Sequence, residues 1–378
     1  MIIELTSEQK ESKEMFREFT ETEVIPNANR FDAEEHLSED IISKMSKKGY
    51  LGSIIPRSYG GSEMDNITVG ILNEELGRGC SSVRSVITVH SMVALAILKW
   101  GNKEQREYWL PQMASGEVIS AFGLTEPNIG SDAKSIETTA RLDGDTYILN
   151  GSKKWISLGQ IAKMFLIFAQ YEGKPTAFLI EKDRPGLNIK PISGLLGVKA
   201  SMVAEVEIKE CRIPKENLLG REGVGLSHVA LNSLDLGRYT IAWGCVGLAQ
   251  ACLEECIKYS RKRKQFGQVL RQHQLIQKII SEMVVNVKAA RLLCLNAGYL
   301  KSIGDPDSIM ETWNAKYFAS KTAYKVSGDA VQVHGANGCI NDNPVSRFYR
   351  DSKVMEIIEG TSQMHEVLIA MNAFRSMY

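Results

Sequence analysis

Hydrophobic and polar positions change their spacing twice along the chain, which divides the sequence into three blocks. Over residues 1–117 the apolar residues recur every three or four positions, as around Phe16 and Phe19, and this spacing predicts helices joined by short turns. Thr6 opens a capping-box pattern just before the first of these helices. The stretch 56–61 contains a proline and a Gly-Gly pair, so we expect the helices to be interrupted there.

The middle block, residues 118–225, has the chemistry of β-strands. Thr146–Leu149 leads into Asn150-Gly151, a dipeptide that favours a tight hairpin turn. Met164–Ala169 is a short apolar run that ends near a second turn signal at Gly173. Because these strands follow one another without helices between them, we expect an antiparallel sheet or barrel and not a βαβ arrangement.

The last block, residues 226–378, returns to helical spacing. Leu226–Lys262 and Gln274–Ile303 are long amphipathic stretches, and a further helix begins near Ser308. The whole pattern predicts a mostly helical α+β protein with an N-terminal helical domain (1–117), a central antiparallel β domain (118–225) and a C-terminal four-helix bundle (226–378).

Composition and charge exclude several classes of protein. The 378 residues carry 45 Lys and Arg against 45 Asp and Glu, so no excess of positive charge indicates nucleic-acid binding. The strongly apolar run Met92–Leu98 is too short to cross a bilayer. The first residues, Met1–Glu4, become charged too early for a signal or transit peptide. We therefore expect a cytoplasmic globular protein without a membrane or nucleic-acid partner.

Metal and nucleotide motifs are missing from the sequence. The seven cysteines are scattered without a CxxC pair, and the six histidines show no metal-ligand spacing. The glycines of Gly220–Gly225 do not follow the dinucleotide-binding order. These observations argue against metal-dependent hydrolysis, nucleotide hydrolysis and Rossmann-type hydride transfer, and we expect no metal site.

Three segments have residue types that suit a ligand, although each also has an ordinary structural explanation. Phe122–Asp132 combines glycines, a proline and small polar residues, which fit either a ligand loop or a plain connection. Trp155 within Lys153–Gly159 suits stacking on a flat heteroaromatic ring or packing against the core. The basic run Arg261–Gly267 suits either a pyrophosphate or the negative end of a helix dipole.

The fourth segment, Val354–Gln363, contains a glutamate in an unusual setting. Gly360 indicates the end of a helix and Thr361 the start of the next one. Glu359 would then lie at the negative end of a helix dipole and close to isoleucines, and both conditions favour a raised pKa. A carboxylate of that kind is a candidate general base, and the alternative is a solvated glutamate at a helix end.

Together, in this order and at these separations, the four segments resemble the acyl-CoA dehydrogenase family over essentially the whole chain. Pro56–Gly61, Leu234–Arg238 and Gln332–Gly338 add to the resemblance. The family's fold has helical, β and four-helix-bundle domains in the same order as the three blocks. The resemblance also implies one FAD per subunit, a homodimer or homotetramer, and an electron acceptor such as an electron-transfer flavoprotein.

Site residues follow from the resemblance, position by position. It assigns the catalytic base to Glu359. It assigns FAD contacts, some of them across a subunit interface, to Phe122, Leu124, Thr125, Gly130, Ser131, Trp155, Ile156, Ser157, Arg263, Phe266, Gln274, Gln332, Val333, Gly335, Ala336, Thr361 and Gln363. It assigns substrate contacts to Ser131, Asp235, Arg238 and Gly360, to which we add Arg84.

The implied reaction is the oxidation of a CH–CH bond beside a thioester. The α-hydrogen of a thioester is too weak an acid for a carboxylate in water, and it becomes removable when preorganised donors hold the carbonyl oxygen. The family assigns those donors to a ribityl hydroxyl of the flavin and to the Glu359 N–H. The β-hydrogen then leaves as hydride to the flavin.

Some positions depart from the usual family pattern and bear on the substrate. Leu158 stands where Asn is usual, and Met364-His365-Glu366 replaces the common Ile-Gln-Arg. Cys80–Ser85 and Trp243–Gly247 are similar to dehydrogenases that act on hydroxyacyl or aminoacyl groups bound to carrier proteins. Arg84 is then either a partner for a polar acyl head group or phosphopantetheine, or a solvated or structurally paired arginine.

Two other classes of function stay open from the sequence. One is a flavin oxidase or monooxygenase on the same fold, although the presence of Glu359 argues against relatives that lack the base. The other is a flavoprotein that only binds a partner, such as the stress-response relatives associated with DNA, and the zero net charge argues against it. The leading reading is an FAD-dependent dehydrogenase of a short acyl-CoA or acyl-carrier-protein thioester.

Overall fold

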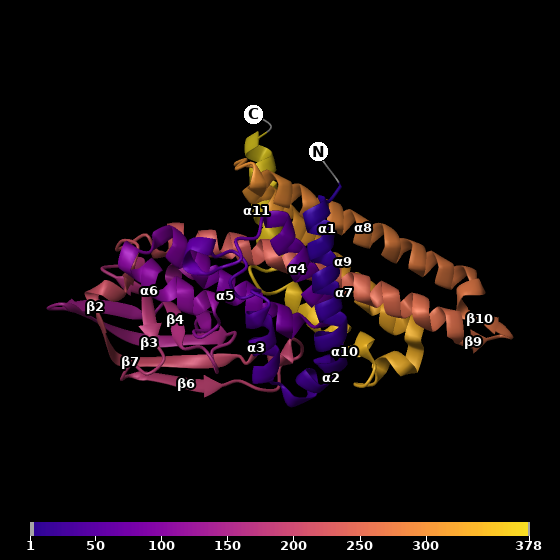
Figure 1. The fold of residues 1–378 in the computed structure, drawn as a ribbon, viewed down its shortest axis with the longest axis horizontal. Coiled ribbons are helices and arrows are strands. Elements are labelled where there is room, and N and C mark those ends of the chain that lie inside the picture. The colour runs from indigo at the N-terminus through magenta and orange to yellow at the C-terminus, as the bar shows by residue number, and fades with distance from the viewer. Residues whose placement is uncertain (1–3, 377–378) are drawn as a thin grey trace.

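The computed structural model describes residues 4–376, in which helices enclose one end of a β-sheet and continue into a long bundle (Figure 1). Residues 1–3, on which the expectation of no leader peptide partly rests, lie outside the described residues. The N-terminal helices are α1 (Ser7–Phe19), α2 (Ile25–Glu34), α3 (Glu39–Lys47), α4 (Asn66–Gly79), α5 (Ser81–Trp100) and α6 (Lys103–Ala114).

Local signals account for the start and the interruption of these helices. At the start of α1 the Thr6 hydroxyl accepts the Gln9 N–H at 3.2 Å, and the Gln9 side chain accepts the Thr6 N–H at 3.1 Å, which confirms the predicted capping box. The stretch 56–61 forms only the three-residue turn Arg57–Tyr59 between α3 and α4. By length and composition α5 is apolar enough to span a membrane, but 83% of its apolar window is buried in the fold, so core packing explains its composition.

The β domain is an eight-stranded sheet in the order β6-β7-β3-β2-β4-β5-β8, with β1 paired to β4. Its strands are β1 (Ser120–Gly123), β2 (Thr139–Asp143), β3 (Thr146–Ile156), β4 (Met164–Tyr171), β5 (Lys174–Glu181), β6 (Leu187–Pro191), β7 (Ala204–Pro214) and β8 (Leu218–Leu219). The pairings are antiparallel except that β1 and β2 each pair with β4 in parallel. The prediction of an antiparallel domain without βαβ units is therefore confirmed in the main, with two short parallel pairings added.

One of the two predicted hairpin turns is wrong. The hairpin at Gly173 joins β4 to β5 as expected. Asn150-Gly151 instead lies inside β3, where the register with β7 shifts between Leu149 and Gly151. The Asn150 side chain accepts the Glu210 N–H at 2.8 Å and donates to the Glu210 carboxylate at 2.7 Å. Asn150-Gly151 therefore forms a β-bulge and not a turn. The reason is that β7 supplies hydrogen-bond partners for Asn150, which the local sequence does not reveal.

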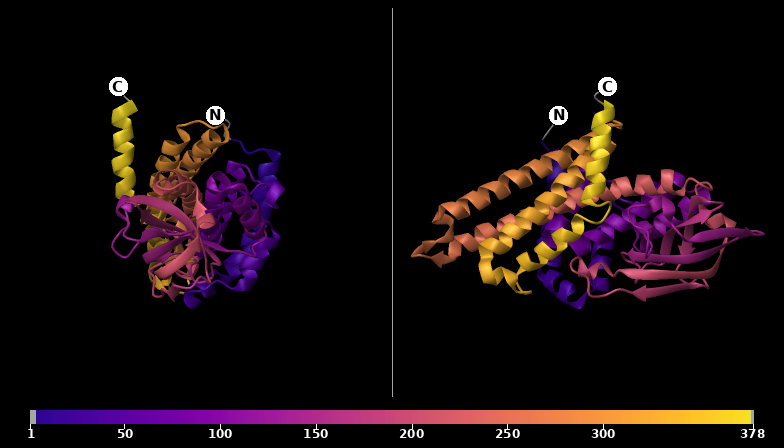
Figure 2. Two further views of the ribbon diagram at one scale, coloured as in Figure 1. Left: turned by 90° about the vertical axis from the view of Figure 1, so that its left-hand side faces the viewer. Right: turned by 180° about the vertical axis from the view of Figure 1, so that it is seen from behind.

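The C-terminal bundle consists of α7 (Leu231–Lys262), α8 (Gln274–Ser302), α9 (Ser308–His334) and α10 (Pro344–Met355), with the short strands β9 (Lys264–Gln265) and β10 (Gln268–Val269) between α7 and α8. The last helix, α11 (Ser362–Ser376), projects away from the body of the protein (Figure 2). On α11, Val367, Met371 and Phe374 are exposed. The limits of the three domains, placed at residues 117 and 225 from the sequence, stay predictions.

Glycines let α4 and α7 approach closely in the centre of the protein. A Cβ atom on Gly70 would lie 2.3 Å from the Trp243 ring, and one on Gly247 would lie 1.9 Å from the Glu74 carbonyl oxygen. Trp243 is 1% exposed. This crossing joins the N-terminal helices and the bundle into a single core.

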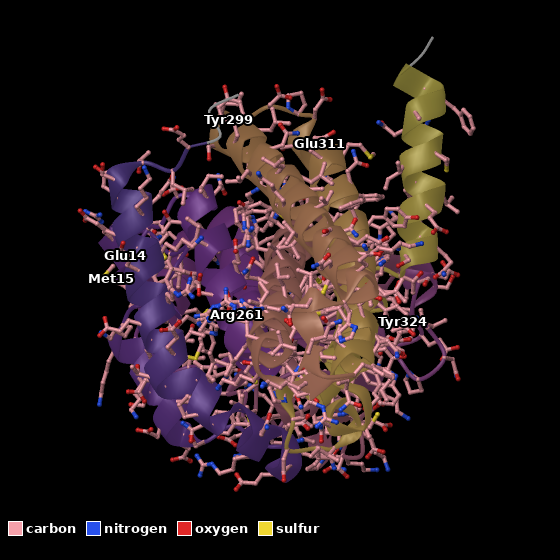
Figure 3. All side chains as sticks on the ribbon, turned by 90° about the vertical axis from the view of Figure 1, so that its right-hand side faces the viewer. Glu14, Met15, Arg261, Tyr299, Glu311 and Tyr324 are labelled. Atoms are coloured by element: carbon pink, nitrogen blue, oxygen red, sulfur yellow. The ribbon has the colours of Figure 1, made fainter. Side chains whose placement is uncertain are left out.

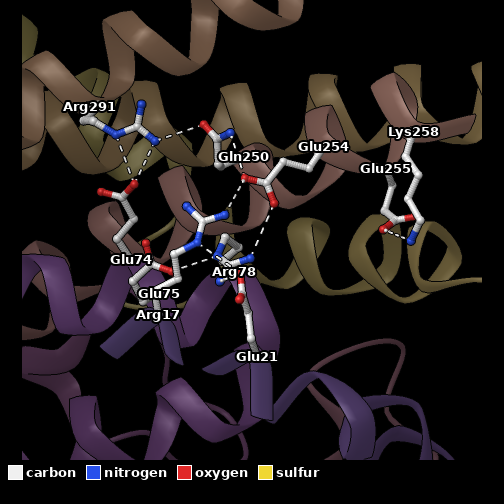
Figure 4. A network of polar contacts seen from close by, with 10 residues as sticks. All are labelled: Arg17, Glu21, Glu74, Glu75, Arg78, Gln250, Glu254, Glu255, Lys258 and Arg291. Carbon is white, nitrogen blue, oxygen red and sulfur yellow. Dashed lines mark hydrogen bonds and ion pairs between the residues drawn. The ribbon is translucent and has the colours of Figure 1, made fainter. Parts of the chain in front are cut away.

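A network of charged side chains surrounds the same crossing (Figure 4). Arg78 on α4 donates to Glu75 at 2.8 Å, to Glu21 at 3.2 Å and to Glu254 on α7 at 3.4 Å. Arg291 on α8 donates twice to Glu74, at 3.0 and 2.7 Å. Each buried carboxylate here has an arginine partner, which satisfies the usual requirement for burying charge.

Candidate active site

The turn between α10 and α11 holds the predicted base. Glu359 and Gly360 both adopt positive φ angles, 56° and 96°. The Thr361 hydroxyl accepts the Met364 N–H at 3.3 Å, so Thr361 caps α11 as the sequence predicts. The left-handed conformation is strained for a glutamate, and residues held in this way cluster at functional sites.

The carboxylate of Glu359 is enclosed and lacks a partner. The residue as a whole is part-buried, but its Oε2 atom is shielded from solvent and accepts no hydrogen bond from any described residue. A Cβ atom on Gly237 would lie 2.7 Å from this oxygen, so only glycine leaves room for it. Burial raises the pKa of Glu359 to about 7, although Arg238, Lys316 and Arg84 all act to lower it. A carboxylate that ionises near neutrality is suited to general-base catalysis.

Two cationic side chains bind the backbone of this turn. Arg238 on α7 donates from Nε to the Glu359 carbonyl oxygen at 3.0 Å. Lys316 on α9 donates from Nζ to the Gly360 carbonyl oxygen at 2.7 Å. The Arg238 guanidinium also lies 4.7 Å from the centre of the Trp313 ring. The base is therefore held through its main chain by two helices of the bundle.

Lys316 was missed by the sequence reasoning, although a signal for it exists. Thr312, Ala315, Ala319 and Ala323 form the buried face of α9, and Lys316 is completely buried beside them. A lysine on the apolar face of a helix is seldom buried without a functional or structural partner. His365, also buried beside Gly360, was noted only as a departure from the family pattern.

Arg84 is buried without an acidic partner. It is 1% exposed, and its Nη1 donates to the Thr88 hydroxyl at 2.6 Å, while its Nη2 lies 3.8 Å from the Met355 sulfur. No carboxylate among residues 4–376 forms an ion pair with it. Gly244 leaves room for the side chain, since a Cβ there would lie 2.3 Å from Arg84 Cδ. Burial excludes a solvated arginine, the hydrogen bond to Thr88 is a structural pairing without a carboxylate, and a role of Arg84 toward the substrate stays a prediction.

The predicted flavin loop is braced by a buried ion pair. Glu126 accepts Lys153 Nζ at 2.6 Å and the Thr138 N–H at 2.9 Å. Burial alone would raise the pKa of Glu126, but the Lys153 ion pair and the N–H donors lower it below its ordinary value. The Lys153 ammonium also donates to the Leu124 carbonyl at 3.3 Å, and the Thr125 carbonyl accepts the Lys154 N–H at 2.9 Å. These bonds fix the loop against β3.

Groups that suit a flat cofactor remain accessible along this loop and the end of β3. Trp155 has a φ of 62° and is 52% exposed. The other predicted flavin contacts here divide into buried Leu124 and Ile156, part-buried Phe122, Thr125 and Ser157, and exposed Gly130 and Ser131. Around Gly130 no atom lies within 4 Å of an added Cβ. An open indole face beside hydroxyls and an unobstructed glycine fits the ring of a flavin.

The end of β3 also connects, through small polar groups, to α5, the helix that carries Arg84. The Leu158 N–H donates to the Ser201 carbonyl at 2.9 Å. The Ser201 hydroxyl lies 3.1 Å from the Ser85 hydroxyl on α5. The end of β3 is thus fixed next to the helix that carries Arg84.

A second group of predicted FAD contacts lies at the other end of the bundle. Arg263, Phe266 and Gln274 are exposed around the β9–β10 hairpin, and Phe266 is 95% exposed. Figure 1 places this hairpin at the far end of the molecule from the sheet. Arg238 lies near the start of α7 and Arg263 follows its end, and a helix of 32 residues is about 48 Å long. Within one chain the hairpin and the turn that holds Glu359 are therefore far apart.

The turn after α9 belongs to this distant group. Val333 is buried, whereas Gln332, Gly335 and Ala336 are exposed. His334 stacks on Tyr259 with ring centres 4.3 Å apart, and Asn337 donates to the Tyr259 hydroxyl at 2.9 Å. These contacts attach the turn to the end of α7.

Other predicted positions differ in what they contact. Asp235 forms an ion pair with Lys301 of α8, while its Oδ1 atom is buried and accepts no hydrogen bond from the described part of the chain. Thr361 is part-buried and Gln363 is exposed at the start of α11. Within residues 4–376 no three His, Cys, Asp or Glu side chains gather as a metal site.

Fold and site together define a class: a helix–sheet–helix protein with an enclosed carboxylate at a strained turn and a half-exposed tryptophan that suits a flat cofactor. Three family profiles match the chain in order. They describe the acyl-CoA dehydrogenase N-terminal domain (residues 6–117), middle domain (121–211) and C-terminal domain (225–374). The chain belongs to the acyl-CoA dehydrogenase family, whose members are oxidoreductases acting on CH–CH bonds.

Named relatives align over nearly the full length. An acryloyl-CoA reductase (NADH) of Anaerotignum propionicum is 38% identical, covering 99% of this chain and 96% of the relative. A short-chain specific acyl-CoA dehydrogenase of Clostridium acetobutylicum is 37% identical, covering 99% of this chain and 100% of the relative.

Solved structures share the fold at similar identity. A chain from the structure of the electron transferring flavoprotein of Acidaminococcus fermentans has a TM-score of 0.96 and 36% identity, with 99% and 100% of the chains covered. The prolyl acyl carrier protein oxidase AnaB has a TM-score of 0.93 and 32% identity, with 98% and 100% covered. A glutaryl-CoA dehydrogenase of Mycobacterium smegmatis in complex with FADH2 has a TM-score of 0.93 and 29% identity, with 98% and 95% covered.

Proposed function

We propose that this protein is an FAD-dependent dehydrogenase of a short acyl thioester, with Glu359 as the base that removes the α-proton. The observation that carries the proposal is the enclosed Oε2 atom of Glu359, which accepts no hydrogen bond from the described residues. Burial raises the pKa of Glu359 to about 7. The carboxylate is thus about half ionised near neutral pH and basic enough to take a proton from carbon.

The residues around Glu359 give the proton transfer its geometry. The Glu359 carboxylate packs against Gly237, and Arg238 holds the Glu359 main chain from α7. The proton moves from the α-carbon of the thioester to Oε2, and the developing enolate needs fixed donors at its carbonyl oxygen. FAD, when bound, supplies the acceptor for the β-hydride. Enclosure of the site keeps water from the base during the transfer.

FAD would be held by two groups of residues from two subunits. Trp155 and Ser157 would face the flavin ring in one subunit, and Arg263 and Gln274 would reach it from the neighbouring subunit. Exposed apolar side chains along α8, at Leu275 (76%), Val284 (43%) and Val285 (66%), support the assembly of a homodimer or homotetramer. FAD content should therefore fall when the oligomer dissociates, and a monomer with full FAD occupancy would contradict this part of the proposal.

The acyl group is proposed to be short and to end in a polar or anionic group. Arg84 is the only residue we assign to that end, because its guanidinium is buried near Glu359 and forms no ion pair within residues 4–376. A bound carboxylate or hydroxyl would give it a charge-assisted hydrogen bond. The short-chain relative and the glutaryl-CoA dehydrogenase are consistent with a short acyl chain.

The carrier of the acyl group is either CoA or a carrier protein. The similarity to a prolyl acyl carrier protein oxidase supports the carrier protein, as do the exposed basic residues Arg261, Lys262 and Lys264 at the end of α7. Figure 3 shows Arg261 on the outer face of the bundle. The acyl-CoA relatives support CoA equally. An electron-transfer flavoprotein is the proposed electron acceptor.

The visible spectrum of the FAD-loaded oligomer tests this function. Under anaerobic conditions butyryl-CoA, and hydroxyacyl or aminoacyl groups bound to CoA and to a carrier protein, are added in turn. We expect at least one thioester to bleach the oxidised flavin absorbance in wild type and to leave it unchanged in Glu359→Gln. Bleaching of equal rate in Glu359→Gln would assign the base elsewhere, with Glu356 the next residue to test.

The same assay separates the two carriers. Docking of an acidic carrier protein on a basic surface is steered by charge, so its rate should fall as salt is added. Fast reduction by butyryl-CoA that is insensitive to salt, with no response to the carrier-bound substrate, would leave an ordinary short-chain acyl-CoA dehydrogenase. Uptake of electrons by oxygen without any other acceptor would instead support the oxidase alternative.

A further inference from the structure

Lys316 is a lysine in the middle of the bundle that neither the predicted flavin site nor the predicted substrate site uses. It is completely buried on the apolar face of α9 between Ala315 and Ala319. No carboxylate of residues 4–376 forms an ion pair with it. Burying a lysine in this way is costly unless its ammonium group has a defined partner. The partner it has is a main-chain carbonyl.

That carbonyl belongs to the residue after the proposed base. Lys316 Nζ donates to the Gly360 carbonyl at 2.7 Å, and Arg238 Nε donates to the preceding carbonyl, that of Glu359, at 3.0 Å. The two carbonyls are consecutive, and the two donors come from different helices, α9 and α7. Fixing consecutive carbonyls removes the freedom of the peptide group between them to rotate.

The peptide group that is fixed in this way is the strained one. Glu359 and Gly360 have φ angles of 56° and 96°, and the left-handed region is unfavourable for a glutamate. A turn of this kind persists only when surrounding contacts hold it. Without both donors, leaving the left-handed conformation would lower the free energy of the glutamate, and its carboxylate would move away from Gly237.

We propose that Lys316 is a positioning residue for Glu359, which holds the turn that aims the carboxylate and supplies a positive charge that favours its ionised form. The inference rests on the proposed role of Glu359 as the base. Lys316 does not touch the reacting atoms in this proposal and acts only through the turn and through its charge.

Charged and titratable groups on every neighbouring element affect the ionisation of Glu359 and of Lys316. Arg84 faces Glu359 from α5, and Arg238 faces it from α7. Cys245 of α7, Glu356 at the end of α10 and His365 of α11 face Lys316. Burial lowers the pKa of Lys316 to about 8 and that of His365 to about 4. Lys316 is therefore still charged, and His365 neutral, at the pH where Glu359 ionises.

Removal of Lys316 should change the pH dependence and not only the rate. Loss of a nearby positive charge raises the pKa of a carboxylate, here by about one unit. Such a rise would lower the ionised fraction of Glu359 about fivefold at pH 7 and hardly at all at pH 9. A residue that merely stabilised the fold would lower the rate by the same factor at both pH values.

The variants are Lys316→Met, which removes charge and donor, and Lys316→Gln, which keeps an amide donor without charge. Both are compared with wild type as FAD-loaded oligomers. The matched control is Lys325→Met, because Lys325 is a half-exposed lysine on the same helix, α9, that pairs with Asp329 at 2.8 Å and with Glu282 at 3.2 Å, neither of which belongs to the turn. Its pH profile should be that of wild type.

Two readouts follow the base. One is bleaching of the flavin by butyryl-CoA between pH 6 and pH 9. The other is exchange of the α-hydrogens of acetyl-CoA for deuterium in D2O, measured by NMR. In this exchange the base removes a proton from the methyl carbon and returns a deuteron, so neither an oxidant nor the hydride acceptor takes part.

Both rates, of bleaching and of exchange, should rise with pH along an acid limb as Glu359 ionises. We expect Lys316→Met and Lys316→Gln to move this acid limb to higher pH by about one unit. Lys316→Met should also lose rate at pH 9, where the charge effect vanishes, because the Gly360 carbonyl has lost its donor. An unshifted acid limb in both variants would overturn the proposal. If Lys316→Met does not fold, Lys316→Gln alone decides it by the same criterion.

Failure of this inference is distinguishable from failure of the proposed function. If Glu359→Gln abolishes exchange and bleaching while the lysine variants keep the wild-type profile, Glu359 is the base and only the role of Lys316 is wrong. If Glu359→Gln exchanges and bleaches as wild type does, the proposed base is wrong and the inference falls with it.

Discussion

Two groups of buried charge involve residues of α7, and they differ in how the charges are paired. At the crossing of α4 and α7, Arg78 and Arg291 meet carboxylates at 2.7–3.4 Å (Figure 4). At the turn after α10, Arg238 and Lys316 donate hydrogen bonds to carbonyl oxygens and not to carboxylates. The Oε2 atom of the nearby Glu359 accepts no hydrogen bond from residues 4–376. The first group is satisfied within the chain and the second is not.

The difference separates a structural use of charge from a chemical one. Arg78 is 5% exposed, as deeply buried as many core residues, yet its partners neutralise it. Arg84 is buried even further, and within residues 4–376 its hydrogen bonds go to a hydroxyl and a sulfur and it forms no ion pair. Keeping a charge buried and unpaired destabilises a protein. A fold that tolerates this cost in one place points to a ligand or a reaction there.

The largest expected effect is the loss of catalysis in Glu359→Gln. Removal of a general base typically lowers the rate by about two to four orders of magnitude. Since Oε2 has no partner to lose, the free energy of unfolding should not fall. Anaerobic flavin bleaching and urea unfolding of the same sample measure both quantities, and a destabilised protein with normal catalysis would reverse the assignment.

Arg78→Met should show the opposite behaviour. Removing one member of a buried, paired network leaves carboxylates uncompensated, which typically costs about 3–5 kcal/mol. We expect a loss of that order in urea unfolding, with wild-type activity per folded oligomer. A variant as stable as wild type would show that the network is no better satisfied than the active site.

Arg84→Met tests the unpaired cation. We expect stability to be unchanged or increased, since a buried charge without a partner is removed. For a thioester with an anionic end, kcat/KM should fall about tenfold to a hundredfold, the range for one charge-assisted hydrogen bond. At pH 9, where loss of the Arg84 charge hardly changes the ionisation of Glu359, butyryl-CoA, which lacks that end, should react as before. An equal loss for both substrates at that pH would remove the proposed specificity.

A surface pair provides the smallest expected effect. Arg212 and Asp143 form an ion pair at 3.1 Å with both side chains more than half exposed. Arg212→Met should change the free energy of unfolding by less than about 1 kcal/mol. A loss as large as that of Arg78→Met would show that pairing alone, and not burial, sets the value of these contacts.

The sequence predicts the fold well because its signals are local and regular. The long helices α7 to α9 follow from spacing alone, and the capping box of α1 forms as expected. The hairpin at Asn150 fails because the side chain finds partners on β7, which no local rule reveals. Signals that depend on a distant strand lie outside what a pattern can predict.

The site is predicted only in part for a related reason. The sequence predicts a raised pKa of Glu359, but the cause in the structure is burial by the folded chain, since its neighbour Ile357 is 54% exposed. The room for its carboxylate comes from Gly237, and the hold on its turn from Lys316, which lie far from it in sequence. The sequence signal for this position is a lysine within the alanine face of α9.

The pH dependence of anaerobic flavin reduction tests the role of Glu359 most directly. The base must be ionised to take the proton, and burial raises the pKa of Glu359 to about 7. With butyryl-CoA, or with whichever short thioester reacts fastest, the rate should rise about tenfold per unit at low pH and level off above a midpoint near 7. A rate that is already constant from pH 5.5 upward would mean that an ordinary exposed carboxylate, or no carboxylate at all, removes the proton.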